Sequence, residues 1–160
     1  MEKEKLFIKA IIGAIILTWL FFTSCKQTNI AEIEPGLPLP ADVIQTSSEV
    51  TQLMTSPASF GNIIQVEHNK YKFEVELNDN KIVKFVSTVD PNFKTADNIK
   101  IGDTYQEIKN KLNEEWAEPG FAYCTKSKTN WVISFFDNYF LKTRQISDTS
   151  KVVFFFKKIN

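Results

Sequence analysis

The chain has 160 residues, with 19 basic and 19 acidic side chains, one histidine and two cysteines. The residues from Cys25 onward carry a net charge of about −1. This balance argues against a nucleic-acid partner, which requires a basic face, and it gives no general attraction to an anionic membrane. One histidine and so few cysteines argue against a zinc cage or a histidine-rich catalytic metal site, so we expect no cofactor and no metal.

The most apolar stretch of the chain lies near its start, at residues 10–22, where only Thr18 carries a polar side chain. Its thirteen residues suit the core of a secretory signal peptide, about 7–15 residues long, better than a bilayer-spanning helix of about 20. The alternative that stays open is a single uncleaved transmembrane helix at residues 6–22, interrupted by Lys9.

The sequence "FTSC" that ends this stretch resembles the lipobox of bacterial lipoproteins, in the loose form typical of Bacteroidota. The resemblance implies cleavage before Cys25, a diacylglyceryl group on its thiol and an acyl chain such as palmitate on the new amine. It predicts a signal peptide at residues 1–24 and a membrane anchor on Cys25. The expected location is the cell envelope, by default the periplasmic face of the outer membrane, because Lys26 stands where Asp favours inner-membrane retention. Phe22 departs from the usual Leu of the motif.

The segment after the anchor lacks aromatic residues until Phe60 and contains Pro35, Pro38, Pro40 and Pro57. Such a composition buries too little apolar surface to offset the entropy of ordering. We therefore expect residues 25–59 to be a lipidated N-terminus and flexible tether. Whether residues 41–54 form a short docked helix stays open, since one helical face would carry Val43, Ser47, Val50 and Met54.

Residues 60–160 hold seventeen aromatic side chains and are long enough for one core. Alternation of apolar and charged residues predicts a strand at Tyr71–Leu77 and a returning strand at Ile82–Val89, after an earlier strand at residues 62–67. Three more strands are indicated by "FAYC", "WVISFF" and "KVVFFFKK", and Lys151, Lys157 and Lys158 bracket the last one as charged guards.

A helix is predicted at about residues 104–116, between these two groups of strands. Thr104 and Glu107 form a capping-box pattern, and Pro119-Gly120 would end the helix. Its apolar side chains, expected to pack on the sheet, are Tyr105, Ile108, Leu112 and Trp116. The predicted class is therefore α+β, an antiparallel sheet of about five to six strands with one covering helix.

The pattern "IKIGDTYQEI" at residues 99–108, with "PG" and "NWVISFF" after it, resembles small bacterial lipoproteins and inhibitors of the β-lactamase-inhibitor-protein-like fold. The outer-membrane lipoproteins of the SmpA/OmlA type belong to this group. The resemblance implies binding or scaffolding with an envelope protein as partner, rather than catalysis, and it carries over no functional residue. The strands at residues 60–89 depart from the order usual in that group.

Two pairs of side chains could in principle carry chemistry. Cys124 with His68 would be a thiol dyad, and Glu74 with Glu76 an acid–base pair. Each has a simpler explanation, because Cys124 suits a buried strand, His68 a surface turn and the glutamates a solvent face. We therefore expect no catalytic residue and no enzyme.

The aromatic content exceeds what a core of this size usually needs, which predicts a surface for a ligand or a partner. Its candidate residues are Phe121, Tyr123, Trp131, Tyr139 and Phe140. The favoured function is a non-catalytic binding or scaffolding module of the envelope. The alternatives are a carrier or sensor of a small apolar ligand and a secreted enzyme.

Overall fold

The computed structural model describes residues 32–56, 58–118 and 122–159, without the side chains of Glu114 and of residues 116–118. These residues belong to one unit, 31–160. The predicted signal peptide, the lipidation site Cys25 and the candidate Phe121 lie outside the described residues. In the described part no helix is long and apolar enough to cross a membrane.

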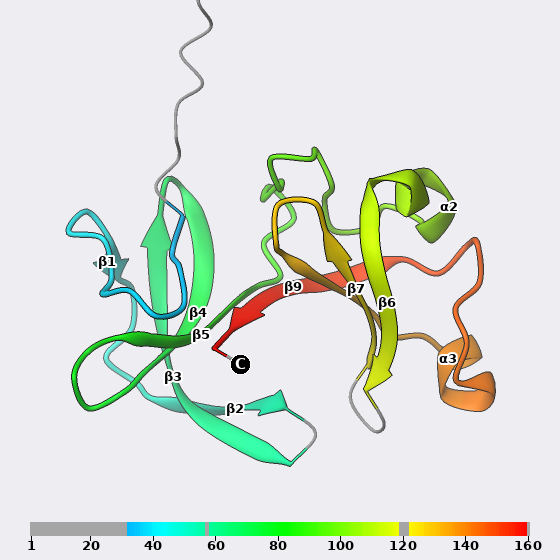
Figure 1. Ribbon diagram of the computed structural model, residues 1–160. Helices are drawn as coiled ribbons and strands as arrows, with labels where there is room; N and C mark the ends of the chain where they lie inside the picture. Colours follow the sequence, from blue (N-terminus) through cyan, green and yellow to red (C-terminus); the bar gives the residue numbers. More distant parts are fainter. Residues whose placement is uncertain (1–31, 57, 119–121, 160) are drawn as a thin grey trace, which may run out of the picture. The chain divides into compact units, whose positions relative to one another are not determined.

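The described chain builds one antiparallel sheet in the order β1-β3-β4-β5-β9-β8-β7-β6, and β2 also pairs with β3 (Figure 1). The strands are β1 (Ile44–Gln45), β2 (Thr51–Ser56), β3 (Ser59–His68), β4 (Tyr71–Leu77), β5 (Val83–Thr88), β6 (Leu112–Glu118), β7 (Ala122–Ser127), β8 (Val132–Phe135) and β9 (Val152–Lys158). The helical elements are α2 (Tyr105–Ile108), the 3-10 turn η1 (Lys109–Lys111) and α3 (Asn138–Thr143). The prediction of a mostly antiparallel sheet with little helix is confirmed. The expected count was wrong, because the described sheet has nine strands and two short α-helices accompany it.

The β3–β4–β5 meander agrees with the alternation read from the sequence. Asn69 and Lys70 adopt positive φ angles of 52° and 69° in the two-residue turn between β3 and β4. Such angles match the turns that the twist of a hairpin favours. At the next turn, the Asn78 side chain accepts hydrogen bonds from the backbone N–H groups of Asn80 and Ile82. The turn residues and the alternation of the strands therefore both favour this meander.

The predicted helix at residues 104–116 is wrong beyond its first turn. Its start is as expected, since a capping box is present and the Glu107 carboxylate accepts from the Thr104 N–H and hydroxyl, both at 2.8 Å. The α-helix ends at Ile108, and from Leu112 the chain pairs with β7 as strand β6. Because the segment is a strand, the i, i+4 spacing of Leu112 and Trp116 does not form a helical stripe. A bulge between Leu112 and Glu114 also shifts the register of the pairing with β7. Pairing with β7 replaces the helical hydrogen bonds, a tertiary effect that local periodicity does not contain.

Thr104→Ala is expected to lower the free energy of unfolding by about 1 kcal/mol through loss of the helix cap. Hydrogen bonds from the Thr104 backbone and side chain lower the pKa of Glu107 below its ordinary value of 4.5. A carboxylate with a lowered folded-state pKa stabilises above its ordinary pKa and loses that contribution as the pH falls through the folded-state pKa. Urea unfolding should therefore show the full difference in free energy of unfolding between wild type and variant near neutral pH. In acid this difference should be smaller. An equal difference at both would exclude the carboxylate from the cap.

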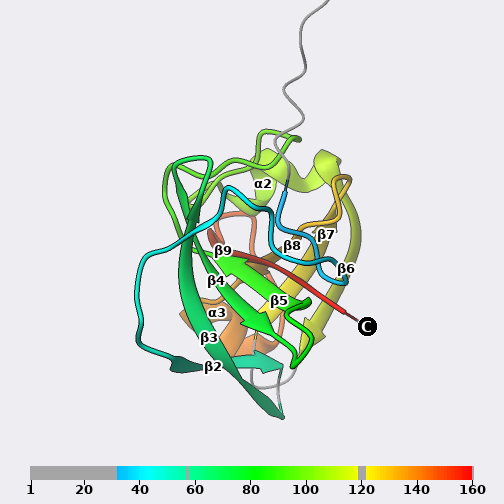
Figure 2. The same cartoon turned by 90° about the vertical axis from the view of Figure 1, so that its left-hand side faces the viewer.

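Residues 32–40, here called the N-terminal strap, belong to the folded body and correct the expected tether at residues 25–59. Ile33 is only 1% exposed and packs in the main core. The backbone N–H of Gly36 donates to the carbonyl of Val83 at 2.8 Å, and the N–H of Val83 donates to the carbonyl of Leu37 at 2.9 Å. The strap can be followed in Figure 2 from its blue start toward the cyan β2.

Residues 41–54 contain β1 and part of β2 and form no docked helix. Both strands pair with β3, so the backbone groups of this aromatic-free segment are satisfied by a sheet edge. Low aromatic content was a poor guide because the segment adds hydrogen bonds and a few aliphatic side chains to a core made elsewhere.

Two clusters of buried side chains account for most of the aromatic content. In the main cluster, Phe93 packs edge-to-face on Trp131 and Phe155, with ring centroids 5.0 and 5.5 Å apart. The second cluster includes Phe85 and Phe156, whose rings stack at 5.8 Å. Since neighbouring residues of a strand face opposite ways, Phe155 and Phe156 serve different clusters. The central strands β5 and β9 are therefore covered on both faces, which requires more aromatic residues than a one-faced sheet.

Candidate functional site

The helix α3 follows β8 directly and is fixed at its start by Asp137. The Asp137 carboxylate accepts from the backbone N–H of Phe140 at 2.8 Å and from the hydroxyl of Ser150 at 2.5 Å. The helix ends at Arg144, which adopts a left-handed conformation with φ 58°. Both ends of this short helix are thus held by local hydrogen bonds, so its side chains have defined directions.

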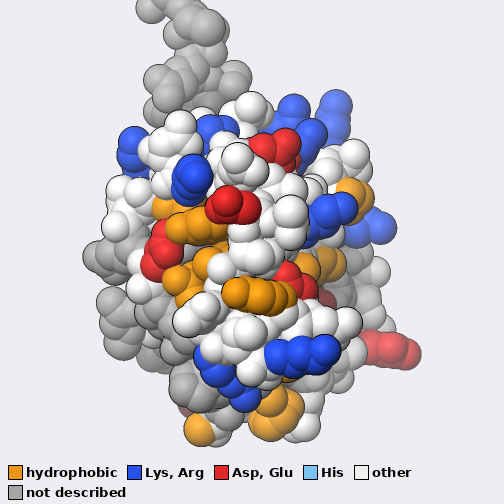
Figure 3. All heavy atoms as spheres, turned by 90° about the vertical axis from the view of Figure 1, so that its right-hand side faces the viewer, with side chains coloured by type: hydrophobic (Ala, Val, Ile, Leu, Met, Phe, Trp, Pro, Cys, Tyr) orange, Lys and Arg blue, Asp and Glu red, His pale blue; other side chains and the backbone are white. Residues whose placement is uncertain are grey.

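One aromatic residue of α3 points inward and its neighbours point outward. Phe140 is buried at 1% exposure, while Phe136, Tyr139 and Leu141 are 45–46% exposed. We call these three side chains, which are exposed around α3, the α3 surface; Phe136 precedes the helix and its ring lies 6.4 Å from that of Phe140. Figure 3 shows this side of the molecule, with apolar side chains interspersed among charged ones. The Arg144 guanidinium lies over the Phe140 ring, 5.4 Å from its centroid, which places a cation beside the surface.

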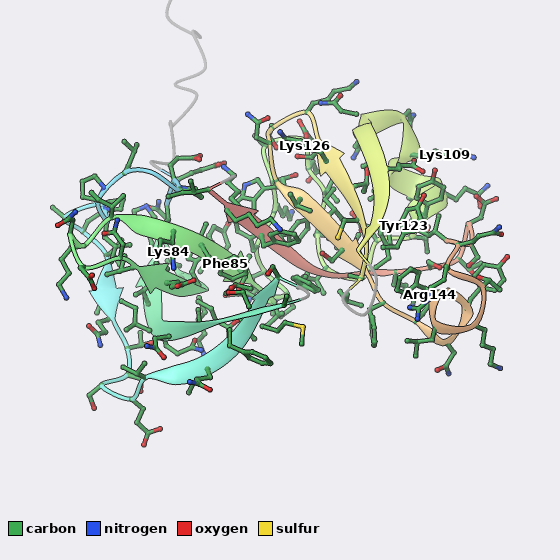
Figure 4. The ribbon with its side chains drawn as sticks, turned by 60° about the horizontal axis from the view of Figure 1, so that its bottom comes forward. Lys84, Phe85, Lys109, Tyr123, Lys126 and Arg144 are labelled. Atoms are coloured by element: carbon green, nitrogen blue, oxygen red, sulfur yellow. The ribbon has the colours of Figure 1, made fainter. Side chains whose placement is uncertain are left out.

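A clamp of two tyrosines on one carboxylate supports this region. The Tyr105 hydroxyl donates to Glu115 Oε1 at 2.5 Å and the Tyr123 hydroxyl donates to Glu115 Oε2 at 3.0 Å. The Tyr105 ring packs edge-to-face on Phe135, and the Tyr123 ring packs in the same way on Phe140. The clamp joins α2, β6 and β7 and continues through Phe140 to α3. Figure 4 shows Tyr123 and Arg144 on the same side of the molecule.

The two tyrosine hydroxyls of the clamp keep their protons because their pKa values are raised. The hydrogen bond to Glu115, together with burial, raises the pKa of Tyr105 to about 12. Burial and the hydrogen bond to Glu115 raise the pKa of Tyr123 to about 12 as well. Both hydroxyls therefore stay protonated donors near neutral pH, which fits a structural role better than proton transfer.

The four candidate aromatic residues that the structure describes do not form one surface. Trp131 and Phe140 are each 1% exposed and are core side chains. Tyr123 is half-buried and contacts Phe140, whereas Tyr139 is exposed on the other side of that helix. Sequence reasoning did not propose Phe136, which ends the predicted strand "WVISFF", or Leu141, which lies within α3.

A buried ion cluster at Lys157 was also missed. The Lys157 side chain is 6% exposed, and its ammonium contacts Glu32 Oε2 at 2.5 Å and Glu34 Oε1 at 2.6 Å. It also lies 4.6 Å from the centroid of the Trp131 ring. The expected role of Lys157 as a solvent-facing guard was wrong. The two-residue period of β9 could have predicted this burial, since Lys157 lies on the same side of the strand as Phe155.

The two pairs considered for chemistry have structural environments. His68 is buried at 2% exposure, which corrects the expected surface turn, and its Nδ1 lies 3.5 Å from Asp42 Oδ2. Cys124 is a fully buried thiol with Ser134 Oγ at 3.8 Å, and in the sheet order four strands separate its strand β7 from the strand β3 of His68.

Glu74 and Glu76 are each held by neighbours of their own. Glu74 accepts from Gln65 at 3.0 Å and from Ser87 at 3.1 Å. Glu76 accepts from the Lys84 ammonium at 2.5 Å. Cross-strand partners on β3 and β5 thus give each carboxylate an ordinary sheet role.

An open pocket of about 380 Å³ lies where β4 meets the loop after β5, and its polar lining includes Lys72, Glu74, Asp90 and Asn92. Burial alone would raise the pKa of Asp90, but hydrogen bonds from the backbone N–H groups of Lys72 and Asn92 outweigh it and lower the pKa. Among the described residues, no group of three or more His, Cys, Asp or Glu side chains could hold a metal ion.

Comparison of the chain with protein-family models, with curated proteins and with solved structures finds no match in any of the three. A functional assignment therefore rests on the sequence features and on the geometry described above.

Proposed function

We propose that this chain is a lipid-anchored protein of the bacterial cell envelope, with Cys25 as the anchor, and that its β-rich body is a non-catalytic binding or scaffolding module. The apolar stretch at residues 10–22 and the "FTSC" sequence support the anchor. The resemblance to small envelope lipoproteins agrees with it and stays a prediction. The periplasmic face of the outer membrane is the proposed location.

The α3 surface is the observation that carries the binding module. Phe136, Tyr139 and Leu141 are exposed around one short helix whose inner side is fixed by Phe140 and whose start is fixed by Asp137. Rigid aromatic side chains give contact area at low entropic cost, which is why they are enriched at protein interfaces. The partner that fits is an envelope protein with an apolar patch and an acidic group to face Arg144.

A carrier or sensor of a small apolar ligand is the second candidate, and a secreted enzyme the third. The pocket of about 380 Å³ is open and has charged side chains in its lining. Trp131 and Phe140, which were candidates to line an apolar groove, are buried in the core. Both facts favour a protein partner over an apolar small molecule.

Photo-crosslinking in living cells tests the surface. With benzoylphenylalanine in place of Tyr139, we expect a discrete crosslinked species. The same probe at Asp79, exposed in the turn between β4 and β5, should give none. The adduct should disappear in a Phe136→Ser/Leu141→Ser background that keeps its cooperative melt. Equal crosslinking at both positions, or an adduct that survives the two serines, would remove the α3 surface as the binding site.

A further inference from the structure

The folded body begins close to the anchor. Glu32, seven positions after Cys25, already pairs with Lys157, and the next residue, Ile33, is already in the core. A chain spans at most about 3.3–3.6 Å per residue, so Glu32 can lie no further than about 25 Å from Cys25. A tether of the length expected from the sequence would have allowed several times that distance. Whichever part of the body lies next to Glu32 is therefore held near the bilayer.

That part can be identified from the contacts within the body. Lys157 joins Glu32 to Trp131, which directly follows the turn between β7 and β8. In that turn, Thr129 donates from its N–H and its hydroxyl to Asp97 in the loop after β5. The same loop accepts at the Asn98 carbonyl from the ammonium of Lys111 in η1, and its Asp90 carboxylate accepts from the N–H of Lys72 at the start of β4. Figures 1 and 2 both show these segments at the end where the described chain starts.

We call this region the lysine end. It comprises residues 67–72, 89–104 and 105–111, and the turn at residues 126–130. Its eight basic residues are Lys70, Lys72, Lys94, Lys100, Lys109, Lys111, Lys126 and Lys128. Its five acidic residues are Glu67, Asp90, Asp97, Asp103 and Glu107. Figure 3 shows basic side chains at the end that carries α2 and a further group at the opposite end, and Figure 4 labels Lys109 and Lys126 at the first of these.

The lysine end reverses the charge of the body as a whole. It carries a net charge of +3, while the rest of residues 32–160 has seven basic and twelve acidic side chains, a net charge of −5. Hydrogen bonds hold three of its acids in place without removing their charge, since Asp97 accepts from Thr129, Asp90 from Lys72 and Glu107 from Thr104. Its lysines are mostly exposed, with Lys111 and Lys126 half-buried. The overall balance therefore hides a separation of charge, which two acids at its border reduce: Asp42 lies beside His68, and Glu114 is the register partner of Lys126.

A pocket on this end is of a size to receive a phosphate-bearing headgroup. It has a volume of about 250 Å³, and Lys94, Lys100 and Lys111 line it. Asp103 and Glu107 line it too, and each is already hydrogen-bonded to the backbone, of Lys100 and Thr104 respectively. The three lysines exceed the two carboxylates in this lining by one charge, which favours an anion over a cation.

We propose that the lysine end lies against anionic phospholipid headgroups. This inference rests on the proposed anchor at Cys25, because attraction to an anionic surface fades within a Debye length of about 8–10 Å. The connection of at most about 25 Å allows the lysines to come within that range, where the attraction of a few charges orients the body. The lysine end of the body then contacts the membrane, and the strap lies beside this contact.

Lysine footprinting of the lipidated full chain tests the contact. The protein is reconstituted into vesicles of phosphatidylcholine alone or with phosphatidylglycerol added, and an amine-reactive reagent is followed by mass spectrometry. With phosphatidylglycerol, labelling of Lys94, Lys100 and Lys128 should slow about threefold or more, and high salt should restore it. Lys81, at the other end of β4, and Lys142 on α3 should label at the same rate in both vesicles.

Labelling rates that are equal at both ends, or equal in both vesicles, would overturn the proposed contact while leaving the anchor intact. Flotation with phosphatidylcholine vesicles reports the anchor separately, and its failure would overturn the proposed function and this inference together. As a charge test, Lys94→Gln/Lys128→Gln should lose most of the protection at Lys109. The matched pair Lys81→Gln/Lys142→Gln should keep it, and equal loss in both variants would also contradict the proposal.

Discussion

A Cys25→Ser chain is expected to keep residues 1–24 and to gain no lipid mass, whereas the wild-type chain should lose them and carry acyl chains. The reason is chemical, because a thioether to the diacylglyceryl group requires the thiol. The apolar stretch before Cys25 has thirteen residues, which suits a cleaved signal peptide. Several acyl chains, at about 0.8 kcal/mol for each buried methylene, would hold the wild-type protein firmly in a bilayer. The effect of this one substitution is therefore all or none.

Intact-protein mass spectrometry of detergent-extracted material decides it. Cys124→Ala is the matched control, because Cys124 is buried in β7 and should leave processing unchanged. A wild-type mass that begins at Met1 without modification would exclude the lipoprotein and favour the transmembrane helix at residues 6–22. A lipid mass on the Cys25→Ser chain would mean that another residue carries the anchor.

Local patterns predicted those elements whose partners are close in the sequence. The alternation of Tyr71–Leu77 needs only the next strand along the chain to be satisfied, and β3, β4 and β5 followed from it. The capping box of Thr104 and Glu107 spans three residues and was equally readable. In both cases the sequence window contains all the groups that decide the structure.

Elements that depend on distant partners could not be read in this way. The spacing of apolar residues predicts a helix that includes Leu112 and Trp116. The segment from Leu112 to Glu118 is instead a strand because it pairs with β7. The strap has the composition of a linker, but Ile33 enters a core whose other members come from much later in the chain. The α3 surface was found in part, because exposure separates Tyr139 from Phe140 and composition does not.

The double substitution Glu32→Gln/Glu34→Gln is expected to lower the free energy of unfolding by about 3–5 kcal/mol, since it leaves a buried charge without its partners. Lys157 has a side chain only 6% exposed, while the side chains of Glu32 and Glu34 are 27% and 41% exposed. The ammonium cannot recover its hydration when the carboxylates are removed. The carboxylates can recover theirs when the ammonium is removed. The cost of breaking the cluster therefore depends on which partner is removed.

Lys157→Met is the matched variant. Methionine fills much of the lysine stem's volume and can keep contact with the Trp131 ring, so this change should cost far less than the double substitution. The triple variant should recover most of the lost stability, because no buried charge then remains. Urea unfolding of the four proteins measures the coupling between strap and strand. If the double substitution costs no more than Lys157→Met, the strap is not held by this cluster. The short connection between anchor and body would then rest on Ile33 and the backbone bonds of the strap alone.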